Sequence, residues 1–457
     1  MTPSMLRLAT FLTTALVGVP MLAADSAQRP GVPNVVVILA DDLGYGDVGC
    51  YGCPDIRTPA IDRLAEQGVR FTCYYANGPE CTPTRTAFMT GRYQQRAGGL
   101  ECAIGNGNVG RYDDAIRLAE QHELGLPPSE NTVVDLLKQK GYTVAGYGKW
   151  HLGYEPKFSP LRHGFDHFFG PLGGGIDYYF HCEPDGSPML YENGRPVERE
   201  GYITDLITEG ALEFLESRRG EKPFFLYLPY TAPHTPLQAP GEKPTAPRTD
   251  ENWNEGTRAT YAAMVERLDQ GIGRVLAAID RAGLRETTLV IFASDNGGTK
   301  TGRNAPFSGH KGGTFEGGIR VPCVVRYPAS LSAGTTFDQP VMTVDLSMSI
   351  IRLAGARPPA DRTMDGLDIL QHIASGQPLP ERPLFWRQRR GDRTWRAVRD
   401  GQLKYIAEHT GKKVTEYVFD LEDDPGETRN LLADRAGDAA RLKAKLAAWE
   451  DAVRPPR

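Results

Sequence analysis

The chain has 457 residues, of which 40% are hydrophobic and 24% charged, and its formal net charge at pH 7 is −5. This is the composition of a globular protein, and it excludes a collagen, a coiled coil and a wholly disordered chain. The slight acidic excess gives no general attraction for phosphate backbones, which argues against a nucleic-acid-binding protein. A chain of this length predicts two or three domains, or one large domain with a smaller one attached.

The first residues have the pattern of a targeting segment. Arg7 precedes the apolar run Leu8–Ala23, and a further small residue follows at Ala27. This pattern predicts a signal peptide over residues 1–24 and a soluble mature chain exported to the periplasm or the medium. The alternative is an N-terminal membrane anchor, but the run is short for a span and contains Pro20. No later segment reaches the length of a membrane-spanning helix.

Short runs of branched and aromatic residues alternate with helical segments. The candidate strands are Val35–Ala40, Tyr142–Tyr147, Phe224–Leu228 and Thr288–Ala293. The candidate helices are Thr58–Gln67, Asn131–Lys140, Thr204–Arg218 and Ala259–Ala282. Unbroken apolar strands of this kind are typical of parallel sheets that are covered on both faces. The alternation therefore predicts an α/β fold with a large central, mostly parallel sheet flanked by helices.

Beyond Asp365 the pattern changes to short strands followed by one helix. The candidate strands are Leu384–Trp386, Trp395–Val398, Lys404–Ala407 and Tyr417–Asp420. The terminal helix is expected over Asp438–Val453, with Asp438 as its N-cap. We therefore predict a large domain over residues 30–377 and a smaller C-terminal α+β subdomain over residues 378–457, built on a short antiparallel sheet.

Each of the four candidate strands in the large domain is followed closely by polar residues. These clusters are Asp41-Asp42, Lys149-Trp150-His151, Pro233-His234 and Asp295-Asn296. Any one of them is explained well enough by a loop carboxylate or a hydrogen-bonded histidine. However, ligands of open α/β sheets bind beyond the carboxyl ends of the strands. The repetition at four strand ends therefore predicts that the clusters converge on one site.

Four residues in these clusters offer only oxygen ligands, namely Asp41, Asp42, Asp295 and Asn296. Oxygen ligands of this kind suit calcium or magnesium rather than zinc or copper. Adjacent buried carboxylates also repel one another unless a cation neutralises them. The alternative is that Asp42 or Asp295 caps a helix, and the group as a whole favours a metal site.

A further cluster begins at Cys81. Pro83 fits the first turn of a helix, so Cys81 is expected at the helix N-terminus, where backbone N–H groups favour an anion. Arg85 follows one turn later on the same face. Two interpretations remain from the residues alone: a nucleophilic thiolate of low pKa, or a buried cysteine beside a surface arginine.

The cysteine count is odd, at seven. Cys50 and Cys53 form a lone Cys-x-x-Cys without a second pair, which is weak support for a zinc site or a redox motif. Export favours disulfides in general. We expect buried thiols with one disulfide at most.

Cys-x-Pro-x-Arg at residues 81–85, followed by Met-Thr-Gly-Arg at residues 89–92, resembles the signature of the type I, formylglycine-dependent sulfatase family of the alkaline phosphatase superfamily. Further segments in the family's order are LADDLGYGDVGCYG, GYGKWHLG, APHTP, SDNGG and GHKGGTFEGGIRVP. The resemblance runs from about Asn34 to Asn430 and departs at Glu80, where the family has a small or apolar residue. The segments 162–166 and 177–181 resemble the branch of arylsulfatases and N-acetylgalactosamine sulfatases.

The resemblance implies a sulfuric ester hydrolase that releases sulfate from a sulfated carbohydrate or an aryl sulfate. Cys81 would be converted to formylglycine by a maturation enzyme, and one hydroxyl of the hydrated aldehyde would attack sulfur while the other later expels sulfate. The implied ligands of one calcium ion per chain are Asp41, Asp42, Asp295, Asn296 and the modified Cys81. Arg85 and His151 match residues that hold the hydrate. Lys149, His234 and Lys311 match residues that bind sulfate, with His234 or Lys311 as general acid.

Other functions stay open at this point. Three cations, Arg85, Lys149 and Lys311, beside a metal favour an oxyanion but do not separate sulfate from phosphate. A phosphoester or phosphonate ester hydrolase of the same superfamily is thus one alternative, and an inactive glycan-binding homologue is another.

The substrate is less determined by the sequence. Tyr178, Tyr179 and His181 either line a sugar subsite or pack under a loop. Six arginines lie near Trp386 and Trp395, at Arg387, Arg389, Arg390, Arg393, Arg396 and Arg399. They form either a surface for a polyanionic glycan or a solvated hairpin.

Overall fold

The computed structural model describes residues 32–105, 115–218 and 222–454, together with Met1. The described residues from Val32 onward form one compact unit. The predicted signal peptide, residues 1–24, lies outside them apart from Met1. In the part of the chain described, no helix combines the length and the apolar character needed to cross a membrane.

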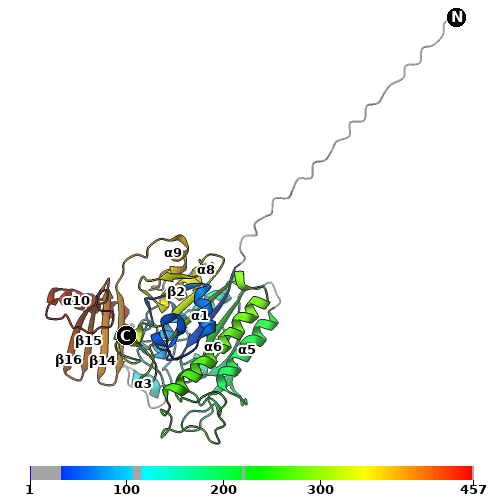
Figure 1. Ribbon diagram of the computed structural model, residues 1–457, viewed down its shortest axis with the longest axis horizontal. Coiled ribbons are helices and arrows are strands. Elements are labelled where there is room, and N and C mark those ends of the chain that lie inside the picture. Colours follow the sequence, from blue (N-terminus) through cyan, green and yellow to red (C-terminus); the bar gives the residue numbers. More distant parts are fainter. Residues whose placement is uncertain (2–31, 106–114, 219–221, 455–457) are drawn as a thin grey trace. The chain divides into compact units, whose positions relative to one another are not determined.

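A ten-stranded mixed sheet forms the centre of this unit (Figure 1), with the strand order β11-β2-β10-β9-β1-β8-β4-β5-β6-β7. Its strands are β1 (Asn34–Ala40), β2 (Val69–Phe71), β4 (Thr143–Tyr147), β5 (His167–Pro171), β6 (Leu190–Glu192), β7 (Arg195–Pro196), β8 (Phe224–Pro229), β9 (Thr288–Ser294), β10 (Cys323–Arg326) and β11 (Thr335–Phe337). The four predicted strands are β1, β4, β8 and β9. They are contiguous and parallel, as the alternation of strands and helices predicted.

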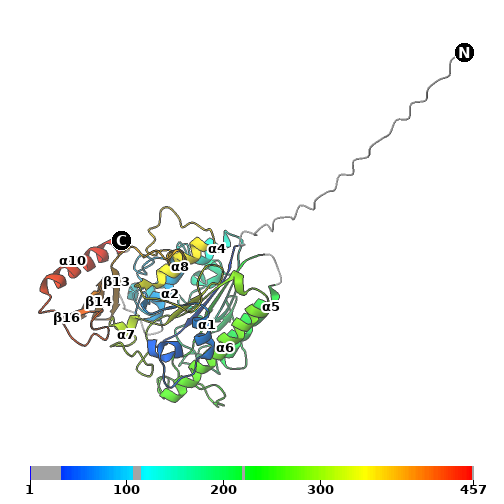
Figure 2. The same cartoon turned by 45° about the horizontal axis from the view of Figure 1, so that its top comes forward.

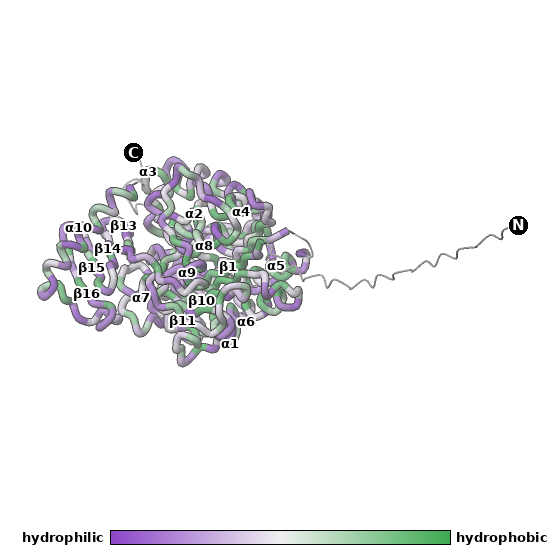
Figure 3. Tube along the Cα trace, turned by 90° about the horizontal axis from the view of Figure 1, so that it is seen from above, coloured by the Kyte–Doolittle hydropathy of each residue, from purple (hydrophilic) through white to green (hydrophobic). Residues whose placement is uncertain are grey.

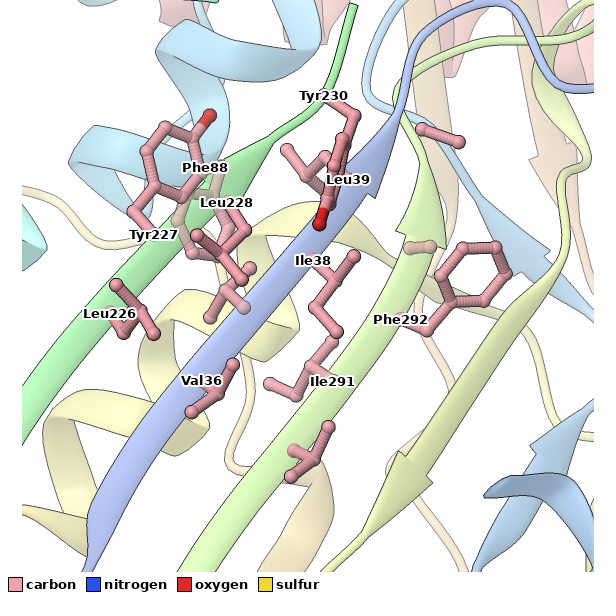
Figure 4. Close-up of a cluster of buried hydrophobic side chains, with 14 of the residues drawn as sticks. Val36, Ile38, Leu39, Phe88, Leu226, Tyr227, Leu228, Tyr230, Ile291 and Phe292 are labelled. Atoms are coloured by element: carbon pink, nitrogen blue, oxygen red, sulfur yellow. The ribbon is translucent and has the colours of Figure 1, made fainter. Parts of the chain in front are cut away.

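β1 is the most enclosed strand, because it pairs with β8 on one side and β9 on the other. All seven of its residues are buried, which explains its unbroken apolar run. Figure 4 shows Val36 and Ile38 beside Leu226 of β8 and Ile291 of β9. The hydrophobic interior around β1 is also visible in Figure 3, where polar residues occupy much of the periphery.

Two groups of helices cover the sheet (Figure 2). One group is α1 (Pro59–Glu66), α5 (Ile203–Ser217) and α6 (Arg258–Arg281), and the other is α2 (Cys81–Thr90), α4 (Val133–Lys138), α8 (Thr343–Leu353) and α9 (Ile369–Ser375). The predicted helices are confirmed as α1, α4, α5 and α6. Shorter helices are α3 (Ala115–Glu120) and α7 (Glu316–Ile319), and β3 (Tyr74–Tyr75) pairs with β12 (Val341–Met342).

A four-stranded antiparallel sheet follows near the C-terminus. It consists of β13 (Leu384–Arg390), β14 (Arg393–Asp400), β15 (Leu403–Thr410) and β16 (Lys413–Asp420) in chain order. One face packs on α10 (Ala436–Val453), where Phe385 stacks on Trp449 with ring centroids 5.1 Å apart. On the other face, Trp386 Nε1 donates to the carbonyl of Ala76 at 2.9 Å. The predicted boundary at residue 377 falls between α9 and β13 and stays a prediction.

The predicted N-cap of the terminal helix is wrong. Arg435 occupies the N-cap position, and Asp438 lies in the first turn. Its carboxylate pairs there with Arg435 and Arg441, at 3.5 and 3.4 Å. A carboxylate is favourable anywhere in the first turn of a helix, so an aspartate predicts a helix start without fixing its position.

A buried ion cluster joins the antiparallel sheet to the rest of the unit. Lys404 of β15 is fully buried, with its Nζ 2.8 Å from carboxylate oxygens of both Glu316 and Glu427. The pKa of Glu427 is raised to about 7, because burial and the Glu316 carboxylate together outweigh the opposing effect of Lys404. Glu427 therefore binds a proton more tightly in the folded protein than in the unfolded chain.

We expect Glu427→Gln to flatten part of the pH dependence of stability. A carboxyl with a raised folded-state pKa contributes stability at pH 5, and this contribution is lost as the pH rises through about 7. The loss is on the order of 2–3 kcal/mol for one such group. Melting temperatures at pH 5 to 8 should fall more steeply in the wild type than in the variant. Parallel profiles would mean that Glu427 is ionised throughout.

Candidate active site

The four parallel strands deliver their polar residues to one place. Asp41 and Asp42 follow β1, Asp295 and Asn296 follow β9, Lys149 and His151 follow β4, and His234 follows β8. The N-terminus of α2 adds Cys81 and Arg85, and Lys311 comes from the segment before α7. All ten sequence-predicted positions therefore meet at the carboxyl edge of the sheet, as predicted for an open α/β fold.

The centre of the site is acidic and fully buried. Asp41, Asp42 and Asp295 are at most 1% exposed. The backbone N–H of Asp42 donates to Asp295 Oδ1 at 3.3 Å, and Asn296 Nδ2 donates to Asp42 Oδ1 at 2.8 Å. Asn296 Oδ1 is buried without a hydrogen-bond partner among the residues that the structure describes.

These oxygens fit a hard divalent cation. A buried amide oxygen without a donor is costly, and a cation among three carboxylates would use it as a ligand. Burial, and after it the Asp41 carboxylate, raise the pKa of Asp295 to about 6 despite the neighbouring Arg85. Four possible ligand atoms, one each from Asp41, Asp42, Cys81 and His234, also lie within 4.8 Å of one another.

Each acid is paired with a cation. Lys149 Nζ lies 2.6 Å from Asp41 Oδ2, and Lys311 Nζ lies 2.7 Å from Asp42 Oδ1. Arg85 donates from Nε and Nη2 to Asp295 Oδ2, at 3.0 and 2.8 Å. The site is thus a compact array of alternating charges, in which the cations can also hold an oxyanion.

Cys81 begins α2 as predicted, and its Sγ lies 3.2 Å from Asp41 Oδ1 and 3.6 Å from Lys311 Nζ. Burial raises the pKa of its thiol well above the usual value, and the Asp295 and Asp41 carboxylates raise it further. The hypothesis of a low-pKa thiolate is therefore not supported by the surrounding protein groups. The alternative of a surface arginine is wrong as well, because Arg85 is fully buried.

Side-chain packing fixes the position of α2 on the sheet. Figure 4 shows Phe88 of α2 against Tyr227 of β8, with stacked rings whose centroids are 5.7 Å apart. Thr82 Oγ1 donates to the carbonyl of His151 at 2.9 Å. The helix that carries Cys81 is thereby fastened both to the core and to the loop after β4.

Both predicted site histidines are uncharged at neutral pH. Burial and then Lys311 and Lys149 lower the pKa of His234 to about 3, and burial followed by Lys149 lowers that of His151 well below its usual value. His234 Nδ1 lies 2.6 Å from the Thr235 carbonyl, which leaves Nε2 facing Asp42 Oδ2 at 3.7 Å. His151 Nε2 contacts the carbonyl of Ile104.

The predicted sugar-subsite residues in segment 177–181 pack under a loop instead. Tyr178 is 1% exposed, and its hydroxyl donates to the carbonyls of Thr231 and His234 at 2.8 and 3.0 Å. The Tyr179 hydroxyl donates to the Ala239 carbonyl, and His181 contacts the Gly201 carbonyl. Tyr178 therefore supports the loop that carries His234, a role that the sequence pattern did not indicate.

A pocket of about 970 Å³ opens onto this site. Its inner end is lined by Cys81, His151, His234 and Lys311. The antiparallel sheet contributes further lining residues, namely Gln388, Arg390, Trp395 and Glu408. Gln388 and Glu408 were not predicted as site residues.

Three of the six arginines of the cluster are paired with carboxylates within the protein. Arg387 pairs with Glu101 and Glu450, and Arg396 also pairs with Glu450. Arg390 pairs with Glu80, and Arg399 donates to the Tyr75 hydroxyl. The cluster is therefore neither an open polyanion surface nor a freely solvated hairpin.

Glu80, the residue that departs from the family pattern, uses both of its carboxylate oxygens in contacts within the protein. One oxygen pairs with Arg390. Its second carboxylate oxygen accepts from the backbone N–H of Ala103 at 2.7 Å.

All seven cysteines lie in the described part of the chain, and none forms a disulfide.

Comparison with known proteins identifies the family of this chain. The sulfatase family model matches residues 33–356, and the N-sulphoglucosamine sulphohydrolase C-terminal model matches residues 310–451. N-acetylgalactosamine-6-sulfatase of Mus musculus is 34% identical over 83% of this chain and 72% of its own length. Steryl-sulfatase of Mus musculus is 35% identical over 77% of this chain and 67% of its own length.

Solved structures give the same result. The crystal structure of Ps i-CgsB is 32% identical, with a TM-score of 0.79, over 91% of this chain and 92% of that one. A second structure of Ps i-CgsB contains k-i-k-neocarrahexaose. The fold of the present chain is the large, mostly parallel sheet with a separate antiparallel sheet that the sequence predicted. With its family models, relatives and fold in agreement, the chain belongs to the sulfatase family and is a sulfate ester hydrolase.

Proposed function

We propose that this sulfatase releases sulfate from a sulfated carbohydrate, with formylglycine at position 81 as nucleophile and one calcium ion. The observation that carries the proposal is the position of Cys81, which lies at a helix N-terminus between Asp41 and Lys311 at the inner end of the pocket. A nucleophile there faces cations on one side and an all-oxygen ligand set on the other. The proposed ligands are Asp41, Asp42, Asp295, Asn296 and residue 81.

The proposed roles of the other residues follow from their contacts. Lys149 and Lys311 present ammonium groups to the oxygens of a bound sulfate while pairing with Asp41 and Asp42. Arg85 fixes Asp295 and donates from Nη1 to the Lys149 carbonyl at 2.9 Å, so it positions both sides of the site. When bound, calcium supplies positive charge that polarises a sulfate oxygen. His151 is proposed to orient the hydrate, and the leaving oxygen to be protonated by Lys311, or by His234 once a bound sulfate group favours its protonated form.

The pocket favours a carbohydrate over a steroid. Besides the inner end, its lining includes many polar side chains and the partly exposed Trp395. A steroid ring system needs mainly apolar walls, whereas polar groups around an aromatic side chain suit a sugar. Among the relatives, the name N-acetylgalactosamine-6-sulfatase and the neocarrahexaose complex of Ps i-CgsB point to the same class.

The proposal extends to maturation and location. A formylglycine-generating enzyme is the required partner, and the signal peptide over residues 1–24 would export the chain to the periplasm or the medium. The catalytic domain would cover residues 30–377 and the C-terminal subdomain residues 378–457.

Side-by-side turnover of 4-nitrophenyl sulfate and 4-nitrophenyl phosphate tests the proposed function. We expect sulfate turnover to dominate and sulfate to be released from N-acetylgalactosamine 6-sulfate. Dominant phosphate turnover would assign the chain to phosphoester chemistry. Binding of the sulfated sugar by matured protein without any sulfate release would indicate a glycan-binding protein.

The general acid can be identified through the leaving group. Nitrophenolate leaves with little protonation, whereas a sugar alkoxide needs a proton, and general acid catalysis contributes about 10²–10⁴-fold. Of the variants His234→Ala and Lys311→Ala, the one that removes the acid should lose much more activity on the sugar sulfate than on the aryl sulfate. Lys149→Ala removes a sulfate contact and the partner of Asp41 but no candidate proton donor, so it serves as control and should affect both substrates equally. Equal losses in all three variants would exclude both candidates.

A further inference from the structure

One rung of the antiparallel sheet faces the pocket. Gln388 of β13 is paired with Trp395 of β14, and Trp395 is paired in turn with Glu408 of β15. Side chains at paired positions lie on the same face of a sheet. The three residues therefore form a row across three strands, here called the 388–395–408 row, and all three line the pocket.

Trp386, two residues before Gln388, shows which face of the antiparallel sheet this is. It is fully buried, and it donates to the carbonyl of Ala76, which lies outside the antiparallel sheet. Because side chains alternate along a strand, the 388–395–408 row lies on this same face, opposite α10. The row therefore lies on the face that packs against the rest of the chain, at the position where this face lines the pocket.

Gln388 has no hydrogen-bond partner in the described part of the chain. Its side chain is fully buried, and both Nε2 and Oε1 are unpartnered. An amide buried in this way destabilises the fold unless something satisfies it. Since the residue lines the pocket, a ligand that offers both a donor and an acceptor would satisfy both atoms.

The charges around the row differ from those at the sulfate end. Glu183, Asp185 and Asp250 line the same pocket together with Glu408. Arg390 lies nearby, but Glu80 already neutralises it. Apart from Lys311, the described lining contains one lysine, Lys300. The lining thus combines the cationic residues of the active site with four carboxylates that belong to none of the strand-end clusters, here called the outer carboxylates.

We propose that the 388–395–408 row is a subsite for the uncharged, hydroxyl- or acetamido-bearing part of the sugar, and that the outer carboxylates disfavour a second anionic group there. The Gln388 amide and the Glu408 carboxylate hydrogen-bond the hydroxyl and amide groups, and Trp395 packs against the ring. This rests on the proposed function and narrows it to glycans with one sulfate on a neutral sugar.

Gln388→Met tests the subsite, because methionine keeps the size and removes both polar atoms. We expect the ratio of kcat/KM on N-acetylgalactosamine 6-sulfate to that on 4-nitrophenyl sulfate to fall about tenfold. The melting temperature should stay equal or rise, because an unpartnered buried amide is gone. Gln402→Met, in the turn after β14 and outside the lining residues, is the matched control and should leave the ratio unchanged. An unchanged ratio in Gln388→Met, or a fall in melting temperature with equal losses on both substrates, would overturn the subsite.

Glu408→Gln tests the charge preference through a change in substrate selectivity, which does not depend on the stability of the variant. The probes are N-acetylgalactosamine 6-sulfate and the same sugar linked to a uronic acid. The wild type should prefer the first, and Glu408→Gln should shift the preference towards the second several-fold, whereas the exposed Glu422→Gln should not. A wild type that prefers the uronate-linked sugar would overturn the charge preference. Absence of sulfate release from every probe in the wild type would instead reject the proposed function.

Discussion

Cys81→Ser protein is expected to lose turnover by roughly 10³-fold or more and to retain a sulfo group on residue 81 after contact with substrate. A serine hydroxyl can take the sulfo group at this position, next to Lys311 Nζ. It lacks the second hydroxyl that a hydrated formylglycine would use to expel sulfate, so the reaction stops half-way. Peptide mass spectrometry of substrate-treated protein measures the bound sulfo group directly.

The wild type provides the complementary measurement. Protein from a host with the maturation enzyme should contain an aldehyde in place of the Cys81 thiol. Cys182→Ser, which changes another buried cysteine outside the pocket lining, is the control and should remain active. An active wild type with an unmodified Cys81, or a Cys81→Ser variant of normal activity, would exclude the formylglycine mechanism.

The strand-end residues could be located from the sequence because each strand and the polar residues that follow it form a local pattern. Val35–Ala40 and Thr288–Ala293 are each unbroken apolar runs ending in acids. Once such strands are parallel neighbours, their carboxyl ends coincide. The order of β9, β1, β8 and β4 in the sheet was not needed for this prediction, only their common direction.

Residues whose position depends on contacts between distant segments could not be predicted. Gln388 has the same strand pattern as Arg387 and Arg389 in the sequence, and it becomes a pocket residue only through the docking of the antiparallel sheet on Ala76. The sequence makes Tyr178 a candidate for a sugar subsite, but its hydroxyl donates to the carbonyls of Thr231 and His234. An aromatic residue beside a polar one has no sequence signal that separates these two uses.

The charge array explains how so many ionisable groups can be buried together. Arg85, Lys149 and Lys311 each contact one of the three aspartates at 3.0 Å or less. Removing one partner of such a buried pair typically costs about 3–5 kcal/mol, because the other charge is left unpaired. Asp295→Ala would therefore leave the buried Arg85 without its carboxylate partner. A loss of activity in that variant could then result either from unfolding or from the missing metal ligand.

Chelation of calcium is expected to abolish turnover and to lower the melting temperature, and Asn296→Ala should weaken both responses. Without a cation, the carboxylates of Asp41, Asp42 and Asp295 face one another and repel. Bound calcium stabilises the folded state by linkage, by about 2.7 kcal/mol at a free concentration of 100 times Kd. Asn296→Ala removes the buried amide oxygen that has no hydrogen-bond partner in the described part of the chain, together with the hydrogen bond from Nδ2 to Asp42. It leaves the contacts of Arg85, Lys149 and Lys311 intact.

Lys311→Ala separates metal binding from catalysis in the same experiment. Its ammonium neutralises Asp42, so its removal should keep the calcium-dependent rise in melting temperature, or increase it, while turnover is lost. Thermal unfolding with and without calcium, measured beside activity for the wild type and both variants, makes the comparison. An all-oxygen ligand set should also respond to calcium and resist soft metals. Full activity of metal-stripped protein, with the metal content verified by elemental analysis, would show that the four oxygen-bearing residues are structural and that calcium has no part in the reaction.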